Sequence, residues 1–140
     1  MADPIIVVTD TPDRQPIEAI ASGLDSFNDE VTGINDRLPL IVFAKDPVCG
    51  DLIRGVAGRT SLGLLFDVFY IARNHRGLGL GRRILQSAEE EGRRRGCRAG
   101  VLCTISFQAP GFYQRHDWRI FGEVSYDPPG TSRIFMTKEL

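Results

Sequence analysis

The chain has 140 residues, a length that fits one domain with a substantial core. Its net charge near −1 argues against a nucleic-acid binder, and no window approaches the roughly 20 apolar residues of a membrane span. The first ten residues, MADPIIVVTD, lack the features of a signal peptide. Three cysteines without metal-ligand spacing fit a reducing compartment, so we expect no metal and a cytoplasmic protein.

The first half of the chain predicts a strand, a helix and a three-stranded meander. A short apolar run predicts a strand at residues 5–9, and helical spacing of apolar residues predicts a helix from Pro16 through Phe27. Strands are then expected at residues 38–45, 52–60 and 66–71, joined by short turns. Gly55 and Gly58 are expected to weaken the second of these strands or to mark a bulge.

The second half predicts a strand-helix-strand unit followed by a hairpin. An amphipathic helix begins at the glycines of residues 77–81 and ends near Gly96. A strand at residues 99–105 should run parallel to the strand at 66–71. A short helix over 109–115, with Phe112 facing the core, precedes strands at 118–126 and 132–138. The whole indicates a single α/β (α+β) domain over residues 1–140.

The glycine-rich turn at residues 76–81 joins the strand at 66–71 to the long helix. A helix N-terminus favours acids, yet Arg82 and Arg83 stand there and the first acid is Glu89. This arrangement costs about 0.3–1 kcal/mol per charge unless an anion binds. Either the arginines are simply solvated around a tight turn, or the site binds phosphate. The Arg82-Arg83 pair excludes a P-loop, and Arg82 also breaks the dinucleotide-binding fingerprint.

The motif Arg76-x-x-Gly79-x-Gly81, between a strand and a helix, resembles the pyrophosphate loop of the GNAT acyltransferase superfamily. The helix carrying Phe112-Tyr113, followed by a strand, resembles that superfamily's second hallmark. Within that superfamily, Ser106-Phe107-Gln108-Ala109, together with Phe-Gly at 121–122 and Pro-Pro-Gly-x-Ser-Arg at 128–133, resembles a subgroup of small uncharacterised bacterial enzymes. The resemblance implies a mixed, mostly antiparallel sheet of about seven strands, splayed at its centre and flanked by helices. It also implies acetyl-CoA as cofactor.

One departure from the family pattern follows the short helix. The tight turn there usually reads Leu-Gly-Phe/Tyr, and here it reads His116-Asp117-Trp118. Aspartate tolerates a left-handed backbone better than most residues, so we expect the turn to survive.

The resemblance implies two catalytic residues. Tyr113 would protonate the leaving thiolate, because a phenol with a pKa of about 10 stays protonated at neutral pH. Its alternative role is that of a core aromatic residue. Asp67 is the candidate base, acting through water, since a carboxylate within an apolar strand is costly unless it faces a cleft or has a partner. A backbone N–H near Phe69 or Tyr70, freed by a local bulge, would bind the oxyanion.

The resemblance also implies binding residues. Expected cofactor contacts are Phe69, Tyr70, Ile71, Arg76, Gly77, Leu78, Gly79, Leu80, Gly81, Arg82, Thr104, Gln108 and Phe112. Expected substrate contacts, by fold analogy, are Phe27, Asn28, Ile34, Arg59 and Ser61.

Other groups are interpreted as bystanders. His75 and His116 are not assigned a catalytic role, and an acyl intermediate on Cys103 is conceivable although no paired histidine is evident. The arginines of residues 93–95 are interpreted as a solvated helix end, paired with Glu89, Glu90 and Glu91 at i, i+4 spacing, with a nucleic-acid patch over residues 93–98 as the alternative.

These patterns predict an N-acetyltransferase that acts on a small-molecule or protein amine by direct attack in a ternary complex. The sequence allows a homodimer and predicts no nucleic-acid or membrane partner. The alternative is a CoA-binding regulatory or partner-binding module without turnover.

Overall fold

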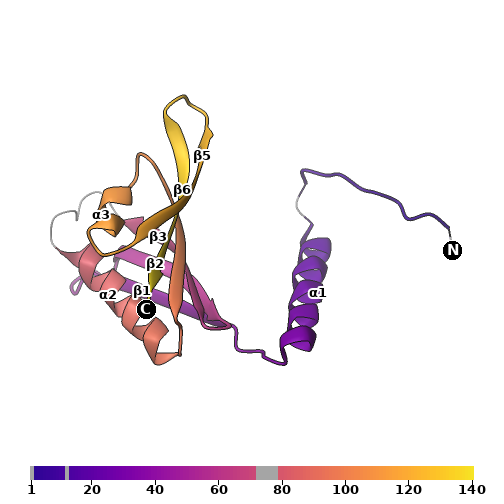
Figure 1. Ribbon diagram of the computed structural model, residues 1–140, viewed down its shortest axis with the longest axis horizontal. Coiled ribbons are helices and arrows are strands. Elements are labelled where there is room, and N and C mark those ends of the chain that lie inside the picture. Colours follow the sequence, from indigo (N-terminus) through magenta and orange to yellow (C-terminus); the bar gives the residue numbers. More distant parts are fainter. Residues whose placement is uncertain (1, 12, 72–78) are drawn as a thin grey trace. The chain divides into compact units, whose positions relative to one another are not determined.

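A computed structural model describes residues 2–11, 13–71 and 79–140, with residues 67–71 described by their backbone alone. The chain divides into two compact units, residues 1–35 and 36–140, each of which is described by itself. Figure 1 labels their helices and strands.

The first unit contains helix α1, Arg14–Thr32. The Asp13 side chain caps its N-terminus by accepting a hydrogen bond from the Gln15 amide, and Gly33 ends it in the left-handed conformation with φ of 70°. The strand expected at residues 5–9 is wrong, because these residues form no regular structure. A short apolar run becomes a strand only when a neighbouring strand takes up its backbone hydrogen bonds.

The second unit begins with the predicted meander. Strands β1 (Leu38–Lys45), β2 (Leu52–Ser61) and β3 (Leu64–Ile71) pair antiparallel. Leu62 and Gly63, both with positive φ, form the tight β2–β3 turn, and the Leu62 amide donates to the Asp36 carboxylate at 3.0 Å. Of the two alternatives for Gly55 and Gly58, the bulge is wrong: both pair in regular register, and the register shift lies between Ala44 and Lys45.

Helix α2 (Leu80–Arg94) leads into strand β4 (Ala99–Ile105), which is parallel to β3 as predicted. Helix α3 (Pro110–Gln114) and the hairpin of β5 (Arg119–Tyr126) and β6 (Thr131–Glu139) follow. The described residues form one sheet with the order β1-β2-β3-β4-β6-β5. It has six strands rather than about seven, because residues 5–9 contribute none.

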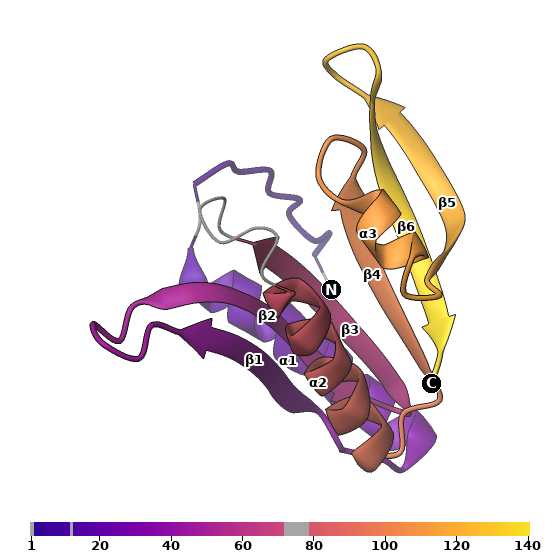
Figure 2. The ribbon, with the colours of Figure 1, turned by 90° about the vertical axis from the view of Figure 1, so that its left-hand side faces the viewer.

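Helix α2 supplies apolar side chains to two separate cores. Figure 2 shows it lying over β1–β3, with α3 beside β4 and β6. Ile84 and Ala88 pack into the first core, whereas Leu85 packs into the second. The first core is completed by Leu40, Val56, Leu65 and Cys97, and the second by Leu102, Tyr113, Trp118, Ile134 and Met136. Adjacent positions of one helix, about 100° apart, therefore hold both halves of the sheet.

The C-terminal end of α2 is anchored to the sheet through Arg95. Its guanidinium donates to the Pro39 carbonyl at 3.0 Å and to the Thr60 hydroxyl at 3.1 Å. It also pairs with Glu91, as the i, i+4 spacing predicts. Arg94 pairs with Glu91 rather than with Glu90, and this hydrogen bond lowers the pKa of the Glu91 carboxyl. This helix end is thus partly structural rather than wholly solvated.

The close contact between β4 and Trp118 gives a test of the second core. A Cβ on Gly100 would lie 2.6 Å from the Trp118 ring, whereas a Cβ on Gly122 would meet Phe135 at an ordinary 3.8 Å. We expect Gly100→Ala to lower the free energy of unfolding by about 1–3 kcal/mol, since overpacking forces a rigid ring to move. Gly122→Ala, also in a strand of this sheet, should change it by less than about 0.5 kcal/mol. Urea unfolding measures both, and equal effects would contradict the packing described.

Candidate functional site

Strands β3 and β4 pair over only part of their length. Their parallel register covers four pairs, from Leu64–Ala99 to Asp67–Leu102. Beyond that point β3 continues to Ile71 beside β2, and β4 continues to Ile105 beside β6. The two strands therefore diverge after Asp67, and the sheet is splayed at its centre as expected. We call this place the splay.

The splay exposes backbone groups on the facing edges of β3 and β4. Residues 68–71 pair with β2 in unbroken register, including Val56–Phe69 and Gly55–Tyr70, so the bulge expected in this strand is wrong. Alternate residues of a strand direct their N–H groups to opposite edges. The N–H groups of β3 that face β4 beyond Asp67 are therefore made available because the two strands diverge, and no bulge is needed.

The N-terminus of α2 is suited to an anion. Its N-cap is Gly79, with φ of 69° and no capping side chain, and its first turn contains no acid. The first N–H groups of a helix lack partners within the helix, and the helix dipole adds partial positive charge there. Arg82 is exposed in this turn, as is Arg83, while Gly81 is buried. Arg76, Gly77 and Leu78 lie outside the described residues, as does His75.

The end of β4 brings together two predicted cofactor residues. Thr104 is buried and its hydroxyl donates to the Gln108 side-chain oxygen at 3.3 Å. The same oxygen accepts a hydrogen bond from the Ile105 amide at 3.0 Å. Gln108 thereby holds the end of β4 and the start of the segment leading to α3. Its side-chain carbonyl is used structurally, and its amide donors remain directed elsewhere.

Tyr113 and Phe112 differ in burial. Tyr113 is 3% exposed within the second core, whereas Phe112 is half-buried against that core. The expectation that Phe112 faces the core therefore holds only in part, because Tyr113 is the deeper residue. Tyr113 packs against Trp118, with ring centroids 6.3 Å apart and an interplanar angle of 71°. The turn that follows is kept, since Asp117 adopts the expected left-handed conformation with φ of 70°.

The sheet register connects the two predicted catalytic residues. Tyr113 packs in the same core as Leu102, and Leu102 is the register partner of Asp67. Asp67 thus occupies the last paired position before the splay, and Tyr113 lies over the neighbouring strand.

The predicted substrate residues are spread over several elements. Phe27 and Asn28 belong to α1, and Ile34 follows it; these three stay a prediction. Arg59, whose guanidinium lies 5.8 Å from the centre of the Phe66 ring, stands beside the splay because Phe66 precedes Asp67. Ser61 lies at the β2–β3 turn instead, where its hydroxyl donates to the Asp36 carboxylate at 3.4 Å.

The remaining candidate nucleophiles and bases have structural surroundings. The Cys97 thiol is buried in the first core, and burial raises its pKa. Cys103 is half-buried on β4, with its sulfur 3.9 Å from the Thr104 carbonyl oxygen. The His116 ring packs edge-on against Phe112 at 4.9 Å.

Sequence reasoning did not predict the surroundings of several buried polar residues. Glu89 is 3% exposed and pairs with Lys138, so the interpretation of this helix end as solvated is wrong for Glu89. The signal was its position four residues after Leu85, on the apolar stripe of α2. Arg54 is also buried, opposite Ile71 and at an inward position of β2 alternating with Val56. The Ser132 hydroxyl donates to the Glu123 carboxylate at 2.5 Å, a contact that sequence spacing does not indicate.

The mixed sheet, its splay and the acid-free N-terminus of α2 match the fold that the resemblance to the GNAT acyltransferase superfamily implies. Residues 39–120 match the acetyltransferase (GNAT) domain family. The protein belongs to this family and is an acyltransferase enzyme whose cosubstrate is acetyl-CoA.

The chain is similar to characterised and structurally known acetyltransferases. It is 35% identical over 114 residues to the blasticidin-S acetyltransferase of Streptomyces morookaense, covering 78% of this chain and 83% of the relative. It is 26% identical over 133 residues to an acetyltransferase of Agrobacterium fabrum, covering 94% and 96%. A crystal structure of a Bacillus cereus acetyltransferase has a TM-score of 0.79 at 26% identity, covering 96% of this chain and 98% of that one. Among the described residues, no helix combines the length and hydropathy needed to cross a membrane.

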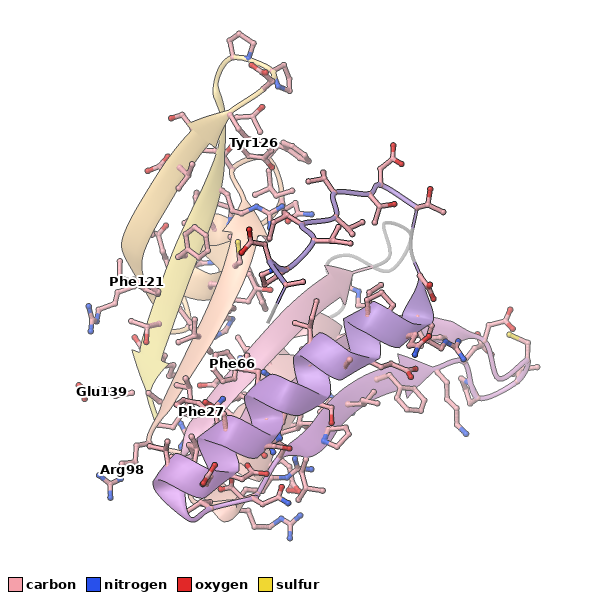
Figure 3. All side chains as sticks on the ribbon, turned by 90° about the vertical axis from the view of Figure 1, so that its right-hand side faces the viewer. Phe27, Phe66, Arg98, Phe121, Tyr126 and Glu139 are labelled. Atoms are coloured by element: carbon pink, nitrogen blue, oxygen red, sulfur yellow. The ribbon has the colours of Figure 1, made fainter. Side chains whose placement is uncertain are left out.

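The α2 N-terminus gives a direct test of cofactor binding. We expect Arg82→Glu to weaken acetyl-CoA binding at least about tenfold, because a charge-assisted contact worth about 1.5–3 kcal/mol is replaced by repulsion. The matched control is Arg98→Glu, the same charge change on an exposed arginine (Figure 3) that follows the C-terminal end of α2 in the chain. Isothermal titration calorimetry measures both affinities. Equal losses would indicate an effect of net charge and contradict a cofactor site at this N-terminus.

Proposed function

We propose that the protein transfers the acetyl group of acetyl-CoA to a primary amine by direct attack in a ternary complex. The observation that carries this proposal is the splay itself, which begins at Asp67 beside the strand that Tyr113 covers. Holding thioester and amine side by side at one place supplies much of the acceleration that such a transfer needs.

Tyr113 serves as the general acid in this proposal. Thiolate departure is assisted by a proton donor within reach, and a phenol supplies one at neutral pH. The aromatic and aliphatic neighbours of Tyr113 hold its ring in one orientation, which a positioned acid requires. The position of Tyr113 on α3, the helix that follows the end of β4, supports its role as the acid.

Asp67 serves as the base, through a water molecule, and β3 supplies the oxyanion donor. An amine must lose a proton before it attacks, and the carboxylate of Asp67 would receive it; the backbone position of Asp67 at the start of the splay supports this role. The backbone N–H groups of Phe69 or Tyr70 that point away from β2 would bind the carbonyl oxygen of the thioester.

The acceptor is a small-molecule amine rather than a protein. The support is the relative from Streptomyces morookaense, whose name gives blasticidin S as its substrate. Blasticidin S is therefore the first acceptor to test, followed by other amine antibiotics, polyamines, amino acids and peptides with free N-termini or lysines. Release of free thiol from acetyl-CoA detects turnover with any of them.

We expect Tyr113→Phe to lower kcat about 100-fold, because general acid catalysis contributes factors of this order, while the Kd for acetyl-CoA changes less than about twofold. The matched control is Tyr126→Phe, an exposed tyrosine of β5 that should keep wild-type kcat.

Two results would count against this role. Equal kcat values for Tyr113→Phe and wild type would remove the acid assignment. Binding of acetyl-CoA by the wild-type protein without thiol release for any amine would favour a CoA-binding module over an enzyme of this specificity.

Direct transfer also predicts the behaviour of Cys103. Replacing this half-buried thiol by alanine should leave kcat within about twofold, since no acyl-cysteine forms in a ternary mechanism. Steady-state kinetics with both substrates varied should give intersecting lines. Parallel lines together with loss of activity in Cys103→Ala would instead establish a ping-pong mechanism.

A further inference from the structure

A buried ion pair joins α2 to β6 away from the splay. Glu89 of α2 has a side chain only 4% exposed, and its carboxylate contacts the Lys138 ammonium of β6. Arg93 lies farther from the same carboxylate, at 3.8 Å, and its own side chain is 47% exposed. Lys138 is 16% exposed and is therefore the main counterion of Glu89. Such a pair is costly to desolvate, so its contribution to stability alone is a weak reason for its presence.

Lys138 makes a second contact that reaches the catalytic helix. Its ammonium donates to the His116 carbonyl oxygen at 2.9 Å. His116 belongs to the turn that ends α3, and its amide in turn donates to the Tyr113 carbonyl at 2.9 Å. The Trp118 amide donates to the same carbonyl at 3.1 Å. One ammonium thus links Glu89 to the turn that fixes the backbone of Tyr113.

This turn carries the chain's departure from the family pattern. Asp117 adopts a left-handed conformation that favours glycine, so the backbone of this turn is more strained than that of the same turn with glycine. An external donor on the preceding carbonyl, at His116, stabilises it. The Tyr113 ring also packs edge-on against the rings of Phe112 and Trp118, so a shift of the turn would move it.

We propose that Glu89 and Lys138 are positioning residues that set the orientation of Tyr113 through the His116 carbonyl. The inference rests on the proposed role of Tyr113 as general acid and adds two residues that touch neither substrate. Glu89 orients the ammonium, and Lys138 holds the turn.

The test separates positioning from stability. Lys138→Met alone leaves a buried carboxylate without its main counterion and risks unfolding, so the key variant is Glu89→Leu/Lys138→Met, which removes both charges and keeps an apolar filling. Lys138→Arg keeps a cation and donors. Lys45→Met, at the exposed end of β1, is the control, since Lys45 and Lys138 are the two lysines of the chain.

We expect the double variant to remain folded and to bind acetyl-CoA within about twofold of wild type, while kcat falls about tenfold. The single variant Lys138→Arg should keep most of the wild-type kcat, and Lys45→Met should keep all of it. Adding Tyr113→Phe to the double variant should lower kcat only about tenfold further, against about 100-fold in the wild type, because the misaligned acid has already lost part of its contribution. Unchanged kcat in the double variant, or losses that simply multiply, would overturn the inference.

A second readout needs no turnover. Hydrogen exchange at the His116 and Trp118 amides should be at least about tenfold faster in the double variant than in wild type, with amides of β1 unchanged. Unchanged protection of these two amides would overturn the inference whatever the kinetics. An inactive wild-type protein would refute the proposed function, whereas faster exchange at the turn would still support the mechanical link.

Discussion

The architecture depends on one constraint: two parallel strands that pair briefly and then separate must still be held in a single structure. Four register pairs join β3 to β4, and α2 covers both sides of the line where they part. Ile84 and Leu85 do this by packing into different cores, each burial contributing about 1.5–3 kcal/mol. Splaying the sheet costs backbone hydrogen bonds, and burial of one helix face offsets that cost.

The same constraint underlies the chemistry that we propose. Separation of the strands frees backbone groups of β3 that a continuous sheet would have used. Helix α2 follows β3 in the chain and carries arginines in place of acids at its N-terminus. This N-terminus is the part of the proposed site that would bind the cofactor's phosphates. Tyr113 belongs to the core of the other half of the sheet, so movement between the halves would alter its distance from β3. Packing of α2 against both halves of the sheet therefore holds β3 at a fixed distance from the strand that Tyr113 covers.

Local patterns in the sequence predicted much of this. Alternation and turn residues predicted strands 38–45 and 99–105 with the bounds observed, and the glycine-rich turn predicted where α2 begins. The strand at residues 5–9 failed because strand formation depends on a partner that an apolar run cannot reveal. Glu89 and Lys138 were missed for a related reason: their pairing depends on how α2 packs against β6. The relative burial of Phe112 and Tyr113 was likewise decided by packing around Trp118.

The most direct test of the account is a titration of coenzyme A into isotopically labelled protein, followed by amide NMR. Resonances of Gly79–Arg82 at the α2 N-terminus and of Cys103–Ile105 on β4 should shift together in proportion to saturation, while those around the β5–β6 turn should not. Shifts confined to another surface, with both of these segments unaffected, would contradict a cofactor site at the splay.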